Sequence, residues 1–118
     1  MSERSDRDLL LDIAEAARRI RAYVGDLSYE GFVGDTKTQD SVIRNLEIIG
    51  EAARGTSETL RARTPEIPWK SMTGMRDRLI HAYFGVNLDV VWRVVSAELV
   101  ELAHAVERQL ADAGPEPR

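Results

Sequence analysis

Cysteine is absent from this 118-residue chain. Without thiols there is no disulfide framework, zinc–thiolate site, iron–sulfur cluster or cysteine nucleophile. Long hydrophobic runs are absent too, because no stretch approaches the roughly 18 uncharged apolar residues of a membrane span. The first residues also lack the basic-then-apolar order of a signal peptide. We therefore expect a cytoplasmic protein that does not enter a membrane.

An excess of positive charge is also missing. The chain has 16 Lys and Arg against 20 Asp and Glu, a formal net charge of −4 and a pI of about 5.2. General binders of nucleic acid neutralise many phosphates, so this composition predicts that any such binding uses a local basic cleft. A hydrophobic fraction of 43% excludes disorder as the main state, and the length fits one domain. We assign residues 1–112 to that domain and 113–118 to a flexible C-terminal tail.

Strand signals are nearly absent, whereas helical periodicity of apolar residues is present almost throughout. We predict an N-cap at Ser5 or Asp6 for the first helix and at Asn87 for the last. In a short connection, Tyr29, Phe32 and Val33 are expected to fill the core. The pattern predicts an all-α, up-and-down bundle with three long helices, at about 6–23, 38–54 and 87–111, and shorter ones at about 57–63 and 73–83.

The second long helix carries charges opposite its apolar stripe. Arg44, Glu47, Glu51 and Arg54 follow at spacings of three, four and three, so neighbouring opposite charges can pair along one face. We favour a solvated charged face, and the second interpretation is the polar wall of a site. Whether Glu47 and Glu51 line a cleft stays open at this point.

One short segment concentrates most of the reactive side chains. Between Gly74 and Val86 the chain has two arginines, a carboxylate, an imidazole and a phenol, namely Arg76, Asp77, Arg78, His81 and Tyr83. The other histidine, His104, lies beside the core stripe of the last helix and is expected to be structural or exposed. A charged helix with one buried histidine is the alternative interpretation of this segment, and it stays open.

Helix geometry places the members of this cluster differently. In one continuous helix Asp77 and His81 are neighbours one turn apart, so the carboxylate can orient the imidazole. Arg76 and His81, five positions apart, lie about 140° from each other around the same helix. Three arrangements bring them together: the arginine curls round the helix, the helix loosens before Gly85, or a second copy of the chain completes the site. We favour the third.

The chemistry of this set suits a phosphodiester. Histidine transfers protons near neutral pH, arginine holds a phosphate bidentately, and tyrosine binds or positions the same group. These are the groups needed for RNA cleavage by the ribose 2′-hydroxyl, with Arg76, Arg78 and Tyr83 as phosphate contacts. A metal site is disfavoured, because the two histidines are about 23 positions apart and Glu47 with Glu51 suits surface pairing better.

The pattern R-x-x-x-x-H-x-Y, formed here by Arg76, His81 and Tyr83, resembles the signature of HepT-like toxins. These belong to the HEPN group of small helical ribonucleases. The segments 44–53, 65–69 and 74–86 also resemble that family in the same order. The resemblance therefore covers most of the chain.

This resemblance implies a HEPN-like homodimer in which the motif helices meet in a cleft. It implies a metal-independent endoribonuclease with Arg76 and His81 as catalytic residues, supported by Asp77, and no cofactor of its own. It further implies a toxin–antitoxin pair whose partner is a minimal nucleotidyltransferase of the MntA type. That partner uses ATP and magnesium to transfer AMP onto the motif tyrosine, here Tyr83, and so silences the ribonuclease.

Two alternatives belong to other classes of protein. The first is a non-catalytic helical module that binds a nucleotidyltransferase or a nucleotide, with the same arginines on phosphate and Tyr83 only as a modification acceptor. The second is a structural dimerisation bundle, suggested by the apolar stripe of the last helix. The sequence does not specify whether the RNA would be transfer or messenger RNA, because no base-reading aromatic platform stands out.

Overall fold

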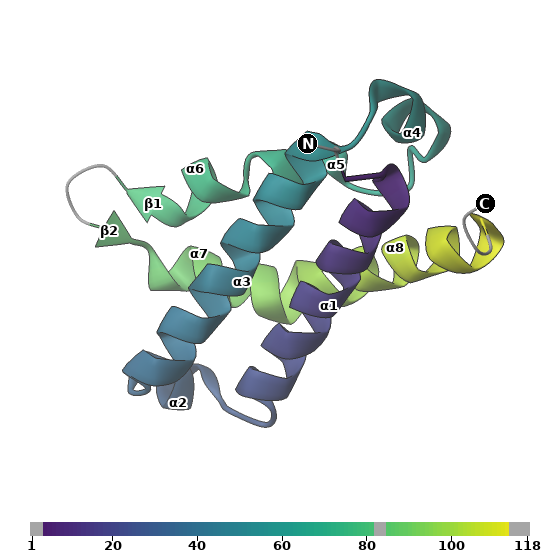
Figure 1. Cartoon of the computed structure of the whole chain (residues 1–118). Coiled ribbons are helices and arrows are strands. Elements are labelled where there is room, and N and C mark those ends of the chain that lie inside the picture. Colours follow the sequence, from purple (N-terminus) through teal and green to yellow (C-terminus); the bar gives the residue numbers. More distant parts are fainter. Residues whose placement is uncertain (1–3, 82–84, 114–118) are drawn as a thin grey trace.

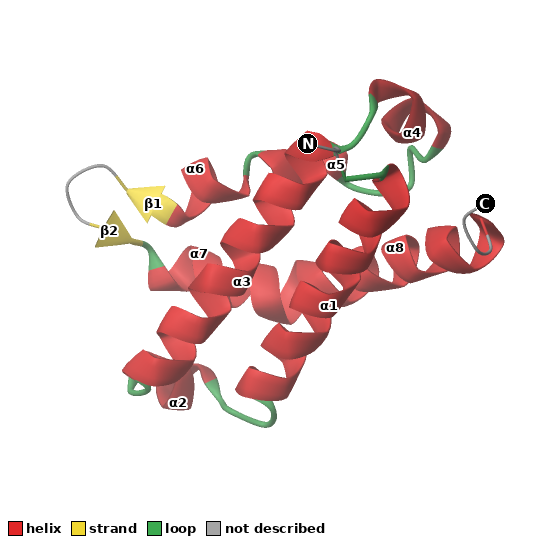
Figure 2. Ribbon diagram, viewed as in Figure 1, coloured by secondary structure: helices red, strands yellow, loops and turns green. Residues whose placement is uncertain are grey.

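Helices make up nearly all of the structure (Figures 1 and 2). The computed structural model describes residues 4–81 and 85–113, and for Ile80, His81 and Ala113 it describes the backbone alone. The predicted all-α class is confirmed. In chain order the elements are α1 (Asp6–Val24), α2 (Tyr29–Val33), α3 (Thr36–Gly55), α4 (Glu58–Arg63), α5 (Trp69–Thr73), α6 (Met75–Leu79), β1 (Ile80–His81), β2 (Gly85–Val86), α7 (Leu88–Arg93), the π-helix η2 (Val94–Glu98) and α8 (Leu99–Ala113).

Side-chain caps fix where the long helices begin. Ser5 starts α1 with a capping box, and the side chain of Asn87 accepts from the amides of Asp89 and Val90 at 3.0 and 3.2 Å to start α7. Both predicted N-caps are confirmed. Helix α3 begins two residues before its predicted start, because the Asp35 carboxylate caps it by accepting from the amide of Thr38 at 3.0 Å.

Three long helical segments form the body of the protein. Figure 1 shows α1 and α3 running side by side in opposite directions, while α7, η2 and α8 follow one another as a third long segment that crosses this pair. Helix α1 contacts both α3 and α8. The core between them is apolar and includes Ile13, Ile20, Leu46, Ile49, Leu99 and Val106, each fully buried.

Only one of the three residues expected to fill the core from the first connection does so. Phe32 is fully buried, whereas Tyr29 and Val33 are 37% and 43% exposed, so the prediction is wrong for those two. The five-residue helix α2 turns one face inward, and Phe32 occupies it. The Tyr29 hydroxyl instead donates to Asp89, and its ring meets the edge of Trp92 at a centroid distance of 6.0 Å.

The segment predicted as one helix over 73–83 is interrupted twice. Gly74 caps α5 and α6 ends at Leu79. The chain then forms β1, which pairs antiparallel with β2 in the register Ile80 with Val86 and His81 with Gly85. Gly85 has a φ of +77°, a conformation that favours glycine and is incompatible with a continuing helix. The predicted continuous helix is therefore wrong.

The paired strands set the start of the last helix. The Asn87 amide donates to the carbonyl oxygen of Leu79 at 2.9 Å, which extends the pairing of β1 and β2 by one bond. Asn87 then caps α7, so a reversal of the chain replaces the predicted extra turn of helix. At the other end, α8 stops at Ala113, and the remainder of the predicted tail, 114–118, lies outside the described residues.

Across residues 4–81 and 85–113, no helix is both long enough and apolar enough to cross a membrane.

The buried stripe of α3 gives a first stability prediction. Leu46 is fully buried, so Leu46→Ala should lower the free energy of unfolding by about 2–5 kcal/mol through lost burial and a residual cavity. Leu11→Ala is the matched control, because Leu11 is 45% exposed on α1 and should change stability by less than about 0.5 kcal/mol. Urea denaturation of both variants measures the difference, and equal effects would contradict the described packing.

Candidate active site around Arg76

The structure divides the motif residues between a helix and a strand. Arg76 and Asp77 lie on α6 and are exposed, and the backbone of His81 lies on β1. The predicted one-turn spacing between Asp77 and His81 is wrong, because the helix ends at Leu79. Three arrangements were expected to bring Arg76 and His81 together. One of them requires the helix to loosen before Gly85, and in the structure the helix ends at Leu79. Tyr83 lies outside the described residues.

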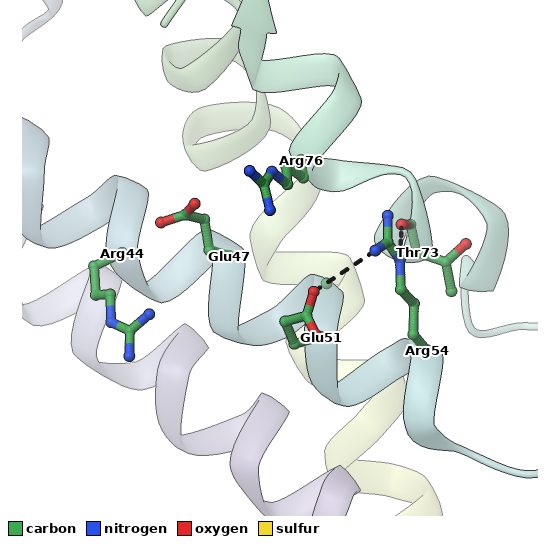
Figure 3. A pocket seen from close by; sticks show the side chains of 7 residues that line it. Arg44, Glu47, Glu51, Arg54, Thr73 and Arg76 are labelled. Atoms are coloured by element: carbon green, nitrogen blue, oxygen red, sulfur yellow. Dashed lines mark hydrogen bonds and ion pairs between the residues drawn. The ribbon is translucent and has the colours of Figure 1, made fainter.

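Arg76 opens onto a pocket between α3 and α6, shown in Figure 3. Its volume is about 170 Å³. The charged face of α3 forms one wall of this pocket, and Glu47 and Glu51 both line it. Arg44, Glu51 and Arg54 are also exposed to solvent, as we favoured. A second hollow shares three of these residues and continues across α3 toward Leu9 and Asp12 of α1. The residues lining the first pocket are Arg44, Glu47, Gly50, Glu51, Arg54, Thr73 and Arg76.

The charges of this pocket are only partly paired. Arg54 meets Glu51 at 3.6 Å, and its Nε donates to the carbonyl oxygen of Thr73 at 3.1 Å, which ties α3 to α5. Arg44, Glu47 and Arg76 form no ion pair with any residue that the structure describes. In Figure 3, Glu47 and Arg76 extend into the same space from α3 and α6, whereas Arg44 turns away. Within the described part of the chain, the pocket thus has three charged lining residues without an ion pair, Arg44, Glu47 and Arg76, of which the last two extend into it.

A glycine on α3 allows the close approach that forms this pocket. A Cβ placed on Gly50 would lie 3.2 Å from the carbonyl oxygen of Met72 and 3.4 Å from the Cβ of Met75. Met72 and Met75 are buried against α3, one on each side of the break between α5 and α6. The missing side chain at Gly50 therefore lets α6 lie against α3 with Arg76 at the pocket. Our interpretation of the sequence did not identify this role, although a glycine inside a helical stripe is a signal of close packing.

The second arginine of the motif has a different environment. Arg78 Nη1 and Nη2 donate to Glu98 Oε1 and Oε2 at 3.0 and 2.7 Å, and Nη1 also donates to Ser71 Oγ at 2.6 Å. Ser71 in turn donates to Glu98 Oε1 at 3.3 Å. The predicted phosphate contact of Arg78 stays a prediction, and the guanidinium meets a carboxylate of η2 in the structure.

This pair also shifts two ionisation equilibria. The hydrogen bond with Arg78 lowers the pKa of Glu98 below its ordinary value, and the hydrogen bond with Glu98 raises the pKa of Arg78. A carboxylate with a lowered pKa in the folded state contributes stability above its ordinary pKa and loses it as the pH falls through the lowered value. The pair is therefore fully ionised at neutral pH.

The second histidine does not line this pocket. His104 is exposed on α8. No group of three or more His, Asp or Glu residues that could hold a metal ion occurs among the residues described.

Comparison with known proteins gives a consistent result. The family model described as "Ribonuclease HepT-like" matches residues 13–109. The chain is 45% identical over 106 residues to a "Probable ribonuclease HepT" of Thermococcus cleftensis, covering 90% of this chain and 96% of that protein. It is 37% identical over 112 residues to a "Putative RNase" of Methanocaldococcus jannaschii, covering 95% and 93% of the two chains. No solved structure matches.

The contact at Gly50 generates a prediction about the pocket. Gly50→Ala gains about 1 kcal/mol of helix propensity but sets a Cβ against a backbone carbonyl that cannot move alone. We expect a net loss of about 1–3 kcal/mol in the free energy of unfolding and altered amide chemical shifts over 72–76. Gly34→Ala is the control, because its Cβ would meet the nearest atom at an ordinary 3.5 Å. A stabilised Gly50→Ala protein with unchanged shifts would contradict the close approach.

Proposed function

Because the chain belongs to the HepT-like ribonuclease family, we propose that it is a metal-independent endoribonuclease and the toxin of a toxin–antitoxin pair. The observation that carries this proposal is the exposed guanidinium of Arg76, which lines a pocket without an ion-pair partner among the described residues. It stands five positions before His81, the spacing of the family motif. The proposed RNA substrate and ATP-using partner fit a cytoplasmic location.

The proposed reaction uses the RNA as its own nucleophile. The ribose 2′-oxygen forms a bond to phosphorus while the bond from phosphorus to the 5′-oxygen of the next nucleotide breaks. His81 transfers one of the two protons that move, and Arg76 offsets the charge that develops on the phosphoryl oxygens. Asp77 supports these two residues. The products are a 2′,3′-cyclic phosphate and a 5′-hydroxyl, and no step requires a metal ion.

A homodimer suits both the charge and the geometry of this site. The chain has a net charge of −4, so RNA binding depends on a local concentration of guanidiniums. Two copies whose motif segments face each other would double the number of Arg76 and His81 side chains in one cleft. The strands β1 and β2 lie beyond α6 at one end of the molecule, as Figure 1 shows, where a second copy would have access.

The proposed control acts on the motif itself. An MntA-type nucleotidyltransferase would transfer AMP from ATP, with magnesium, onto the phenol oxygen of Tyr83, releasing pyrophosphate. The new phosphodiester and nucleoside would stand two residues from His81 and compete with RNA phosphate for Arg76. Inhibition then follows from charge and bulk alone, without a change of fold.

Cleavage kinetics test the catalytic assignment. With EDTA present, His81→Ala and Arg76→Ala should each lower the cleavage rate of single-stranded RNA by about 10²–10⁴-fold, because each removes a group that acts in the transition state. His104→Ala is the matched control and should retain wild-type activity, since His104 is exposed on α8. Circular dichroism and sedimentation of each variant confirm an unchanged fold and oligomeric state.

Two results would reject this assignment. Full activity of His81→Ala would remove the proton-transfer role. Inertness of the unmodified wild-type protein toward transfer, ribosomal and messenger RNA would favour the non-catalytic module that binds a nucleotidyltransferase or nucleotide.

Modification by the partner is tested separately. After incubation with a nucleotidyltransferase of this type, ATP and magnesium, the wild-type protein should gain the mass of AMP on the peptide containing Tyr83, and Tyr83→Phe should not. Tyr23→Phe is the control, because Tyr23 is 44% exposed on α1 and should leave the modification unchanged. Equal AMP incorporation into Tyr83→Phe would exclude Tyr83 as the acceptor.

A further inference from the structure

The two arginines of α6 face opposite sides of the helix. Positions two apart in a helix differ by about 200° around its axis. Arg76 accordingly lines the pocket beside α3, whereas Arg78 meets Glu98 of η2 on the other side. Residues that the sequence presents as one basic cluster are therefore separated by the helix that carries them.

The contacts of Arg78 have the geometry of a clamp. Both terminal nitrogens donate to the two oxygens of one carboxylate, at 3.0 and 2.7 Å, and the hydroxyl of Ser71 bonds to both partners. Such bidentate pairs fix orientation as well as distance. The clamp joins α5 and α6, which adjoin in the chain, to η2, which follows them only after β1, β2 and α7.

The carboxylate of this clamp lies at the end of a π-helix. The amide of Leu99 donates to the carbonyl oxygen of Val94, five residues back, so the segment Val94–Glu98 has one residue more per turn than an α-helix. An extra residue rotates every later position by about 100°, and it changes which residue of this helix faces α6. The π-helical turn therefore helps to place Glu98 opposite Arg78.

We propose that Arg78 and Glu98 are positioning residues, whose clamp holds α6 from the side opposite the pocket so that Arg76 keeps its place for catalysis. This role rests on the proposed ribonuclease function. It assigns Arg78 to the support of the motif instead of to RNA phosphate. A phosphate contact would require Arg78 to leave Glu98, and that carboxylate, 35% exposed, would lose its only ion-pair partner in the described structure.

The clamp affects the position of Arg76 more than it affects the stability of the fold. Its two side chains are 31% and 35% exposed, and ion pairs with that much solvent contact add little to the free energy of folding. Catalysis is more sensitive, because a small displacement of a transition-state group costs up to about 10²-fold in rate. The expected signature is thus a loss of turnover in a protein that is still folded.

Glu98→Gln separates positioning from phosphate binding. If Glu98 is part of a clamp, Glu98→Gln should lower kcat by about 10–100-fold and leave KM on a short single-stranded RNA within about 2-fold. If Arg78 instead binds phosphate, removing the carboxylate frees the guanidinium, so KM should fall and kcat should hold.

Arg78→Ala should reproduce the kcat loss, and the exchanged pair Arg78→Glu with Glu98→Arg should recover at least about tenfold of it. Arg19→Ala, which removes an exposed ion pair on α1, is the control.

Salt dependence gives a second readout. In a His81→Ala background, which binds without cleaving, each phosphate contact adds about 0.7 to the slope of log affinity against log salt for single strands. Arg76→Ala should reduce that slope by about this amount, and Arg78→Ala should leave it unchanged. An equal reduction by Arg78→Ala, together with unchanged kcat in Glu98→Gln, would overturn the positioning role.

Amide hydrogen exchange keeps the inference testable without activity. Loss of the clamp in Glu98→Gln should speed exchange at least about fivefold at the amide of Arg78, which donates to the carbonyl oxygen of Gly74 at 3.1 Å. Inert wild-type protein with this faster exchange would reject the proposed function and keep the clamp. Active wild-type protein with neither kcat nor exchange altered by Glu98→Gln would keep the function and reject the clamp.

Discussion

The close approach of α3 to the break between α5 and α6 is the constraint on which the rest of the site depends. It exists because residue 50 has no side chain, so the backbone of Met72 lies directly against α3. This contact fixes the start of α6 and brings Arg76 over the charged face of α3. The charged face of α3 thereby forms one wall of a pocket that is open to solvent. The same contact leaves room for Glu47 to extend beside Arg76 (Figure 3).

The arginines around this contact differ in whether another side chain in the described structure pairs with them. Arg54 is tied to Glu51 and to the backbone of α5, and Arg78 is tied to Glu98 and Ser71. Arg76 has no such partner among the described residues. An acidic protein can in this way present a cationic group at one place, because two neighbouring guanidiniums, those of Arg54 and Arg78, are already paired. Local pairing, more than net charge, decides where an anion would bind.

The sequence predicted the parts of the fold that depend on local chemistry. Ser5 and Asn87 cap their helices as expected, and the apolar stripes of α1, α3 and the last helical segment are buried. It failed where residues distant in the chain decide the conformation. The predicted motif helix ends at Leu79, where the chain pairs with β2 instead, and the partner of Arg78 lies 20 positions away on a π-helix whose extra residue the apolar periodicity does not predict. The role of Gly50 was not predicted from the sequence, because it depends on a tertiary contact with Met72 and Met75.

Membership of the HepT-like ribonuclease family and the guanidinium of Arg76, which has no ion pair within the described ranges, lead to one central claim. We propose that RNA is cleaved by its own 2′-hydroxyl without a metal ion. The ends of the RNA fragments report this chemistry directly. We would digest a defined single-stranded RNA with the unmodified protein in EDTA and identify the new termini by mass spectrometry. The account predicts 2′,3′-cyclic phosphates and 5′-hydroxyls. Fragments with 3′-hydroxyl and 5′-phosphate ends, formed only when a divalent metal is supplied, would contradict it.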